Sequence, residues 1–539
     1  MSTRDAEYKP LLYTTTIRNP ERFKDFMHIL YRYDGRVLSN ELIEEIECEF
    51  FKVGLYRPMK RPHSVLEKFR STRNGEFSEF ALTPKEAKEL FDMNDPNKNP
   101  GIKGHKEYGF DKGWPSRFDT QFKLMKVLGF VYYNIGEAIR FSEVGKYLAQ
   151  AVEISIVGDQ VSREVVHPEY EQMAFTQAFA KQQRCNPFIK ELNDNIPLIL
   201  LLETIQLLNS DPELNSRSGH AKGISYREIP LIIFWKDNNA QAVYQRIKRL
   251  RQEYGYNPSN EVIADICTKE ILGGFKKFDV DSIVHEYPDE FIRKMRMTGL
   301  ISFRGAGRFI DINHAEDAKV DYIISHYSTY DKYEDEREYF NYMSTIDPEL
   351  FNCRAIIYEK SDAAGLLADW TSVYKWEKIK SELQLLAKKS SSADDVLRFI
   401  AAPARLEFLT ALAIKSRLPE VVVIPNYPCD DTGLPTSTAG GNAGDIECIE
   451  DPHGILVEVT MAEGRQQTMM EVWPIDRHLS DFKQKYTEQS QCIFVAPTIF
   501  SDTIKQIAWL KDQPEHSVIR PYKIEEFTAF LEQTSRLYA

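Results

Sequence analysis

The sequence predicts a multidomain α+β protein with a mainly helical N-terminal region, a helical linker domain and a C-terminal α/β domain. Its 539 residues are enough for about three domains. Helical periodicity interrupted by short basic loops dominates roughly the first 300 residues, and strand-like alternation is concentrated near the C-terminus. The polar run KKSSSADD, at 388–395, is the clearest break in the chain. We place the domains at 1–313, 314–389 and 390–539.

Composition narrows the class of protein. Hydrophobic residues make up 42% and charged residues 28% of the chain, which is typical of a globular protein. No apolar run is long enough to cross a bilayer, and the first residues lack the apolar stretch of a secretory signal, so no membrane association is expected. The seven cysteines are scattered without a CxxC pair, which argues against a zinc site or disulfides and fits a reducing cytoplasm.

The net charge of −13 argues only weakly against nucleic acid as a partner, because local clusters matter more than the sum. Residues 57–73 carry six Lys or Arg against one acid, with aromatic residues interleaved. Such a segment can follow a phosphate backbone, although a solvated surface is the alternative. We expect DNA contacts from Arg57, Lys60 and Arg61. A second basic cluster covers 217–251 and includes a helix expected over 240–254.

A third basic feature has a more defined shape. A helix is expected over 289–298, ending at Gly299, and two alternating segments, 300–304 and 308–312, flank the turn Gly305-Ala306-Gly307. A helix followed by a basic hairpin is typical of a winged helix, which places the helix in the major groove and the wing on the backbone. The alternative is any helix–hairpin unit of an α+β domain. The expected DNA contacts here are Arg293, Lys294, Arg296, Arg304 and Arg308.

Residues 314–389 are helical, highly charged and rich in tyrosine, and we interpret them as a connecting domain. In the last domain, the apolar helix expected over 404–415 contains one acid, Glu407. Two strands, 445–450 and 455–461, form a hairpin that brings Asp445 and Glu458 close together. A carboxylate within an apolar strand is costly unless it is paired or binds a cation.

Asp445 followed thirteen residues later by Glu458 matches the metal-binding spacing of PD-(D/E)xK nucleases, with Thr460 where lysine is usual. This spacing alone occurs by chance in many hairpins. The longer run GDIECIEDPHGILVEVTMAEGRQQTMMEVWPIDRHL resembles the AlwI family of type II restriction and nicking endonucleases, whose core reads DIxC…VEVTMA…G…Q…ME…P…RHL. LEFLTA, at 406–411, resembles the LEWxT…A helix of that family, and LLYTTTIRNPERF, at 11–23, resembles its N-terminus. The family also lacks the lysine, so Thr460 agrees with it.

The resemblance implies a Mg²⁺-dependent, sequence-specific nuclease of double-stranded DNA, in which Mn²⁺ can substitute. It implies metal ligation by Asp445, Glu458 and the Val459 carbonyl. It implies further site roles for Glu407 and Glu471, which complete the acidic centre, and for His478, which lies near the scissile phosphate; Gln466 or Gln467 is a candidate for orienting the site.

It also implies a bacterial, cytoplasmic enzyme of the type IIS kind, which cuts outside an asymmetric site within a restriction-modification system. One nuclease domain cuts one strand, so cutting both requires dimerisation, a second subunit or sequential attack, and nicking stays open.

Two other functions are compatible with parts of the sequence. A sequence-specific DNA-binding protein with an inactive nuclease domain would keep the basic modules but lose the acids, and all four acids are present. A metal-dependent phosphoesterase acting on a small substrate would leave the long basic N-terminal region unexplained.

Overall fold

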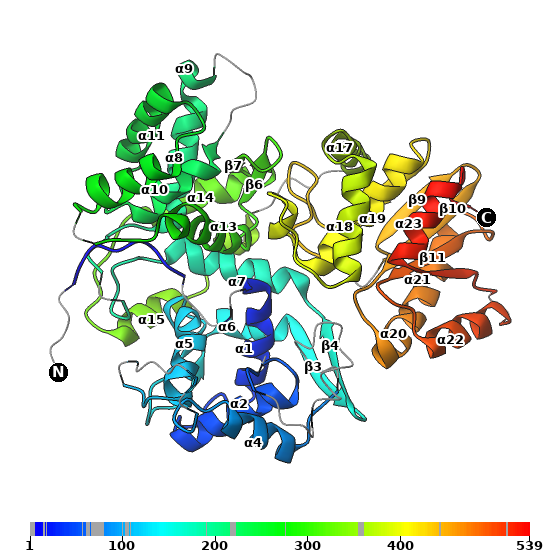
Figure 1. Ribbon diagram of the computed structural model, residues 1–539, viewed down its shortest axis with the longest axis horizontal. Helices are drawn as coiled ribbons and strands as arrows, with labels where there is room; N and C mark the ends of the chain where they lie inside the picture. The colour runs from blue at the N-terminus through cyan, green and yellow to red at the C-terminus, as the bar shows by residue number, and fades with distance from the viewer. Residues whose placement is uncertain are drawn as a thin grey trace. The chain divides into compact units, whose positions relative to one another are not determined.

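A computed structural model of the chain shows two compact units, unit 1 (Met1–Ala355) and unit 2 (Ile356–Ala539) (Figure 1). The residues that the structure describes are 6–13, 17, 19–56, 58–60, 65, 80–99, 101–102, 107, 109–189, 191–215, 223–274, 276–353, 360–440, 443–513 and 516–538. Both units mix helices with sheet, so the predicted multidomain α+β class is confirmed. None of the helices within these ranges is both long and apolar enough to span a bilayer.

Unit 1 is mainly helical and carries three small sheets. Its first half contains η1 (Pro20–Arg22), α1 (Phe23–Tyr31), α2 (Asn40–Lys52), α4 (Pro84–Met93), α5 (Trp114–Val127), β1 (Val131–Tyr132), β2 (Arg140–Phe141), α6 (Glu143–Gln150), β3 (Val152–Val157), β4 (Gln160–Val165) and α7 (Pro168–Lys181). Its second half contains α8 (Pro197–Ser210), α9 (Pro212–Asn215), β5 (Ile224–Ser225), η3 (Tyr226–Glu228), α10 (Ile229–Phe234), α11 (Ala240–Tyr254), α12 (Asn260–Asp265), η4 (Ile266–Ile271), η5 (Ser282–Glu286), α13 (Tyr287–Arg296), β6 (Ile301–Arg304), β7 (Phe309–Ile312), η6 (His314–Glu316), α14 (Asp317–Tyr327), α15 (Glu336–Ser344) and α16 (Pro348–Asn352).

The helices of unit 1 form where local sequence and core packing agree. In α2, the Ser39 side chain accepts a hydrogen bond from the Leu42 amide and caps the first turn. Ile43, Ile46 and Phe50 follow at helical spacing and are fully buried. The same helix also buries a carboxyl group, Glu47, inside this core.

A three-stranded sheet follows α13. β6 and β7 form an antiparallel hairpin, and β5 pairs with β7, so the strand order is β5-β7-β6. The turn between β6 and β7 contains Gly305, Ala306 and Gly307, and all three have positive φ angles. The helix expected over 289–298 is present but begins two residues earlier and ends two residues earlier.

Unit 2 contains one five-stranded sheet. Its elements are α17 (Lys360–Val373), α18 (Trp376–Ala387), η7 (Leu397–Phe399), α19 (Ala402–Arg417), β8 (Val422–Pro425), β9 (Ile446–Glu450), β10 (His453–Val459), α20 (Gly464–Met470), α21 (Val472–Lys485), β11 (Gln491–Ala496), α22 (Ser501–Lys511), β12 (Ile519–Lys523) and α23 (Ile524–Gln533). The strand order is β12-β11-β10-β9-β8, in which β10, β11 and β12 are parallel and β9 is antiparallel to both neighbours.

Helices cover both faces of this sheet. Leu456, Cys492 and Phe494 pack with α21 and α22 in one core cluster. On the other face α19 contacts β8 and β10, and α23 contacts β11, β12 and α19 (Figure 1). Strands that are buried on both faces are nearly continuous apolar runs, so a polar residue within one stands out. Glu458 in β10 is such a residue.

The predicted boundaries at 313/314 and 389/390 stay predictions. Of the helices that fall in the proposed linker, 314–389, α14, α15 and α16 belong to unit 1, whereas α17 and α18 belong to unit 2.

Candidate active site

The β9–β10 hairpin brings two acids together. Val457 pairs with Ile446 across the hairpin, so the next residues along, Glu458 and Asp445, are neighbours. The Oδ2 atom of Asp445 accepts a hydrogen bond of 2.7 Å from the Val459 amide. The two carboxyl groups are also within hydrogen-bonding reach of each other. The hairpin therefore holds both acids at the end of β10.

Gly444 permits this close approach. A Cβ atom at this position would lie 2.5 Å from Leu456 Cδ1 and 2.7 Å from Glu458 Oε1. Asn426 fixes the same segment, because its amide donates to the Asp445 carbonyl at 2.9 Å and its side chain donates to the Gly444 carbonyl at 2.5 Å. The segment before β9 is therefore held by the hydrogen bonds of Asn426 and packs closely against Leu456 and Glu458.

Glu407 enters the site from α19. Its side chain is buried, and Oε2 accepts a hydrogen bond of 2.9 Å from the Ala439 amide. It also lies close to Asp445 and Glu458. The charge of Asp445 raises the pKa of Glu407, and the charge of Glu407 raises the pKa of Glu458. Helix α19 is buried along most of its length, so this acid does not lie on a surface face.

Glu471 lies at the junction of α20 and α21. Its Oε1 atom accepts a hydrogen bond of 2.8 Å from the Thr460 hydroxyl. That hydroxyl also accepts from the Ala462 amide at 3.0 Å. Lysine is usual at this position in PD-(D/E)xK nucleases. Thr460 adds no positive charge there, and its hydroxyl instead orients Glu471.

His478 reaches the acids from α21. Its Nδ1 atom lies 2.9 Å from Glu458 Oε1, and both side chains are buried. The apolar face of α21, including Val472, Ile475 and Leu479, packs on the sheet and fixes this geometry.

Burial and mutual repulsion dominate the electrostatics. Burial raises the pKa of Glu407, Asp445 and Glu458 well above the usual range of carboxyl groups. The next largest cause is a neighbouring carboxylate in each case: Asp445 for Glu407, Glu458 for Asp445, and Glu471 for Glu458. A cation among these groups would favour their ionised forms.

The donor atoms fit magnesium better than a softer metal. Within the described residues, no group of three or more His, Cys, Asp or Glu side chains is arranged to hold a metal ion by itself. Mg²⁺, however, keeps several waters and is usually bound through only one or two carboxylates. Asp445 and Glu458, two adjacent carboxylates that repel each other, supply that kind of site.

Gln467 has a different role from the one considered above. It is fully buried, donates to the carbonyls of Ala462 (3.1 Å) and Thr498 (2.8 Å), and accepts from the Phe500 amide at 2.9 Å. It therefore ties α20 to the chain after β11. Gln466 contacts Met470 within α20.

Three residues near the acids were not expected from the sequence. Asn426 clamps the segment before β9, as described above. Thr410 lies one turn beyond Glu407, and the ring centroid of Tyr427 lies 6.5 Å from that of Phe408. Both residues have a buried hydroxyl group without a hydrogen-bond partner among the residues that the structure covers. Asn426 and Tyr427 follow a strand in a segment without periodicity, so no sequence pattern marked them.

Two of the expected DNA contacts, Arg57 and Arg61, lie outside the described residues. Lys60 is exposed, and its Nζ atom donates to Asn99 Oδ1 at 3.1 Å.

The basic residues of α13 differ in their surroundings. Lys294 is fully buried and pairs with Glu290, so it is not available to a DNA phosphate or base in this conformation. Its aliphatic chain packs in the core, and the carboxylate of Glu290, one helical turn earlier, neutralises its charge. Arg293 is partly exposed and pairs with Asp289 at 3.2 Å. Arg296 is partly exposed and lies over the Phe303 ring at 4.9 Å.

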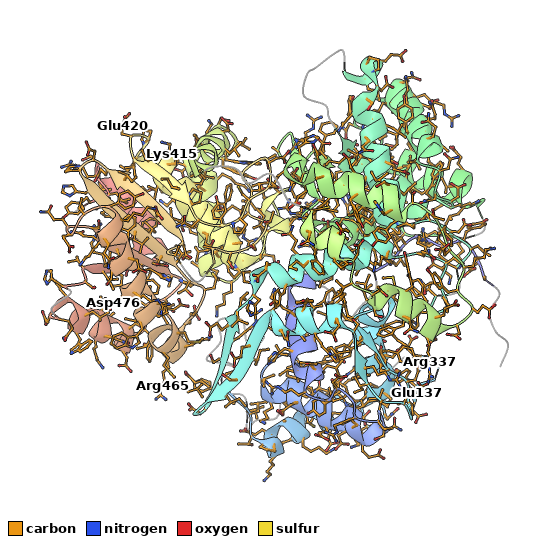
Figure 2. All side chains as sticks on the ribbon, turned by 180° about the vertical axis from the view of Figure 1, so that it is seen from behind. Glu137, Arg337, Lys415, Glu420, Arg465 and Asp476 are labelled. Atoms are coloured by element: carbon orange, nitrogen blue, oxygen red, sulfur yellow. The ribbon has the colours of Figure 1, made fainter. Side chains whose placement is uncertain are left out.

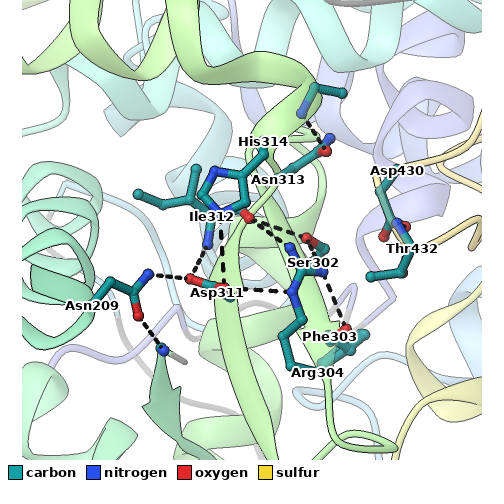
Figure 3. A network of polar contacts seen from close by, with 12 residues as sticks. Asn209, Ser302, Phe303, Arg304, Asp311, Ile312, Asn313, His314, Asp430 and Thr432 are labelled. Atoms are coloured by element: carbon teal, nitrogen blue, oxygen red, sulfur yellow. Dashed lines mark hydrogen bonds and ion pairs between the residues drawn. The ribbon is translucent and has the colours of Figure 1, made fainter. Parts of the chain in front are cut away.

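A buried polar network holds Arg304 (Figure 3). Its Nε atom lies 3.4 Å from Asp311 Oδ2, and its guanidinium donates to the Ser302 hydroxyl at 3.0 Å. Asp311 is fully buried and also accepts a 2.7 Å hydrogen bond from Asn209 of α8. Arg304 thus joins β6 to β7 and α8. Arg308, in the turn, is exposed and packs against the Phe309 ring.

The chain matches one protein-family model over most of its length. The family model described as AlwI restriction endonuclease matches residues 126–368 and 368–530, which is well over half of the chain. No curated protein matches it. Among solved structures, the small subunit of the heterodimeric restriction endonuclease R.BspD6I is similar, with 21% identity over 29% of this chain and 77% of that chain and a TM-score of 0.25.

Proposed function

Because the chain belongs to the AlwI restriction endonuclease family, a family of enzymes that hydrolyse DNA, we propose that it is a Mg²⁺-dependent, sequence-specific endonuclease of the type IIS kind. In this proposal unit 2 cuts the phosphodiester bond and unit 1 reads the sequence. The observation that carries the chemistry is the cluster of Glu407, Asp445, Glu458 and Glu471 at the end of β10.

We propose that Asp445, Glu458 and the Val459 carbonyl hold the cation. A divalent cation supplies Lewis-acid polarisation of the phosphate and a lower pKa for water. The Val459 amide holds Asp445 in place, and His478 holds Glu458. Ordered partners of this kind raise the affinity of metal-binding side chains. Because the pKa values of these acids are raised, cation binding also requires that they lose protons.

The remaining acids position the site. Glu471, oriented by the Thr460 hydroxyl, and Glu407, oriented by the Ala439 amide, surround the two ligands and are candidates to orient the attacking water. With threonine at 460, the positive charge near the phosphate has to come from another side chain. His478 can supply a donor through its second ring nitrogen, and Arg465, which is exposed at the start of α20, is a second candidate.

For recognition we propose the winged-helix module of unit 1. The strand order β5-β7-β6, with α13 directly before the hairpin, supports this assignment. Arg293 and Arg296 of α13 and Arg308 of the wing are the proposed DNA contacts. Lys294 and Arg304 instead shape the module, because one is buried and the other is held by Asp311.

If unit 1 binds the recognised sequence and unit 2 cuts as a separate body, cutting outside the recognised site, as in type IIS enzymes, follows. We propose the bacterial cytoplasm as the location of the enzyme. Double-stranded DNA is the proposed substrate. Cutting of both strands would require a second active site from another copy or subunit, or sequential attack by one site.

The decisive experiment is digestion of a plasmid of known sequence with Mg²⁺, with Mn²⁺ and with EDTA, followed by mapping of the ends on both strands. We expect cuts at a fixed distance from one asymmetric sequence with either metal and none with EDTA. Asp445→Ala and Glu458→Ala should abolish cutting but keep sequence-specific gel shifts. Asp451→Ala, in the exposed turn of the same hairpin, is the matched control. Full cutting in EDTA, or by either site variant, would overturn the proposal.

A further inference from the structure

Two buried hydroxyl groups beside the acids, those of Thr410 and Tyr427, have no hydrogen-bond partner in the part of the chain that the structure describes. Thr410 is fully buried, and Tyr427 is 5% exposed. A buried polar group without a partner lowers the stability of the folded protein, and native structures contain few of them. Two of them on neighbouring elements of one site therefore point to a bound partner.

Hydroxyl groups of the same two kinds are satisfied elsewhere in the chain. Tyr133 and Tyr374, both at most 4% exposed, donate to carboxylate oxygens at 3.1 Å and 2.7 Å. The helical threonines Thr120 and Thr176 donate back to the carbonyl group four residues earlier, at 2.8 Å in both cases. Thr410 makes no such bond, so its hydroxyl is not turned back onto the backbone of α19.

The path of the chain brings both hydroxyl groups to Glu407. The chain reverses direction between α19 and β8, at the turn marked by Lys415 and Glu420 in Figure 2. Lys415 holds this turn, because its Nζ atom donates to two carbonyl groups there, at 2.7 Å and 3.1 Å. From the end of α19 back to Glu407 is ten residues, or about 15 Å of helix, and from the start of β8 to Tyr427 is five residues, or about 16 Å of extended chain. Since α19 and β8 pack on each other, Tyr427 returns to the level of Glu407 and Thr410.

Glu407 has unused capacity for hydrogen bonds. Thr410 follows it by three residues and so lies on the same face of α19. Burial first, and then the charges of Cys429 and Glu407, raise the pKa of the Tyr427 hydroxyl well above its usual range, so the carboxyl group of Glu407 lies near that hydroxyl. Among the described residues, Glu407 accepts a single hydrogen bond, from the Ala439 amide, although a carboxylate can accept about four.

We propose that Thr410, Tyr427 and Glu407 hold one ordered water between them, and that Thr410 and Tyr427 position the Glu407 carboxyl group through this water. Buried waters typically make about three hydrogen bonds to polar groups that the protein leaves unsatisfied, and these three side chains supply that number. The water can donate to Glu407 and accept from Tyr427, and the Thr410 hydroxyl can act as donor or acceptor.

This inference rests on the proposed function, in which Glu407 is a candidate to orient the attacking water. The Ala439 amide holds one oxygen of Glu407, and the bridging water gives the carboxyl group a second fixed contact. Together they restrict the carboxyl group to one orientation. The bridging water is structural and is distinct from the attacking water, so Thr410 and Tyr427 are positioning residues.

The test is a double-variant cycle in the full-length protein. Tyr427→Phe and Thr410→Val each remove one hydroxyl group and keep the shape of the side chain. In calorimetric scans in EDTA, each should lower the melting temperature of the transition of unit 2 by roughly 2–4 °C, because each takes one hydrogen bond from the water. The double variant should lower it by clearly less than the sum of the two shifts, because both bonds belong to the same water.

Tyr374→Phe is the matched control, and it identifies the transition of unit 2. The Tyr374 hydroxyl has its own partner, Asp394 Oδ1 at 2.7 Å. This variant should therefore lower the same transition, add fully to the shift of Tyr427→Phe, and keep the cleavage rate of wild type. Tyr427→Phe and Thr410→Val should instead reduce kcat for cleavage roughly tenfold with KM for the recognised duplex unchanged.

The inference fails if either variant leaves the melting temperature unchanged or raises it, because that hydroxyl would then bind no water. It also fails if the two shifts add fully, or if both variants cleave at the rate of wild type. If wild type cuts no DNA with Mg²⁺ or Mn²⁺, the proposed function fails, and the melting temperatures in EDTA still decide whether the three side chains hold a water.

Discussion

His478 and Glu458 form a buried hydrogen bond of 2.9 Å between Nδ1 and Oε1, although they are 20 residues apart in the sequence. The contact joins α21 to the end of β10. It fixes the orientation of the carboxylate that we propose as a metal ligand, and it does so from a helix whose own position is set by the core of unit 2.

The first prediction concerns this contact. His478→Ala should lower the affinity for Mn²⁺ by roughly 10- to 100-fold, the usual cost of losing a partner that orients a ligand. Calorimetric titration of the protein with Mn²⁺ measures this directly. His478→Asn retains a donor and should recover part of the affinity. His453→Ala, which removes a ring stacked on Tyr538 at 3.7 Å in the same unit, should bind Mn²⁺ normally. Equal affinity in His478→Ala and wild type would show that the contact has no such role.

The second prediction concerns repulsion among the acids. Asp445→Asn keeps an oxygen for the Val459 amide and can donate to Glu458, and it cannot carry the negative charge that burial and the neighbouring Glu458 disfavour at this position. We therefore expect a more stable metal-free protein, by about 0.5–2 kcal/mol, together with complete loss of cleavage. Thermal unfolding in EDTA at neutral pH measures the first effect. Asp451→Asn should change neither property. A destabilised Asp445→Asn protein would mean that repulsion does not dominate this site.

The third prediction concerns the wing. Arg308→Ala should weaken binding to all duplexes alike and reduce the slope of log K against log salt by about one, as expected for a lost phosphate contact. Gel shifts of the full-length protein in EDTA over a series of salt concentrations measure both. Lys332→Ala, which removes an exposed cation outside the winged-helix module, is the control. An unchanged slope in Arg308→Ala would exclude a phosphate contact by this residue.

The fourth prediction concerns stability in unit 1. Burial raises the pKa of Glu47 to about 8, and nearby Arg117 offsets part of that rise. In the unfolded chain a glutamate loses its proton at a much lower pH. Between that pH and about 8, the unfolded state therefore binds fewer protons than the folded state. The contribution of Glu47 is therefore fully present below the pKa of the unfolded chain and is lost as pH rises to about 8.

The loss amounts to at most about 1.4 kcal/mol per pH unit within that window. Glu47→Gln keeps the neutral form and should flatten this slope, measured by denaturant unfolding across the window. Glu41→Gln, exposed on the same helix, should keep the slope of the wild type. If Glu47→Gln had the same pH dependence of stability as wild type, the raised pKa of Glu47 could not be the cause of that dependence.

Elements with a strong period were predictable from the sequence. The helix expected over 240–254 is α11, and the hairpin that carries Asp445 and Glu458 is β9–β10. The apolar pattern over 404–415 does not by itself show whether Glu407 is buried or exposed. The structure shows why it is tolerated: the Ala439 amide binds it, and it faces the other acids.

Basic residues were less predictable, because periodicity does not show where a charge finds a partner. Lys294 lies on the edge of the apolar face of α13, and Glu290, four residues earlier, allows its burial. Arg304 belongs to a short strand in which both faces are covered, so alternation did not mark it as outward-facing. Asn426 and Tyr427 depend on contacts with α19 and the segment before β9, which no local pattern encodes.

The close packing at Gly444 has an evolutionary consequence. One added methyl group there would collide with Leu456 and with Glu458, and so would disturb the acids without altering any charge or any residue of the reading surface. Under the proposed function, codon 444 is thus a place where a single base change would silence the nuclease and leave the residues of the winged-helix module unchanged. In populations for which self-cleavage of the chromosome is a burden, inactive alleles should arise repeatedly at this codon.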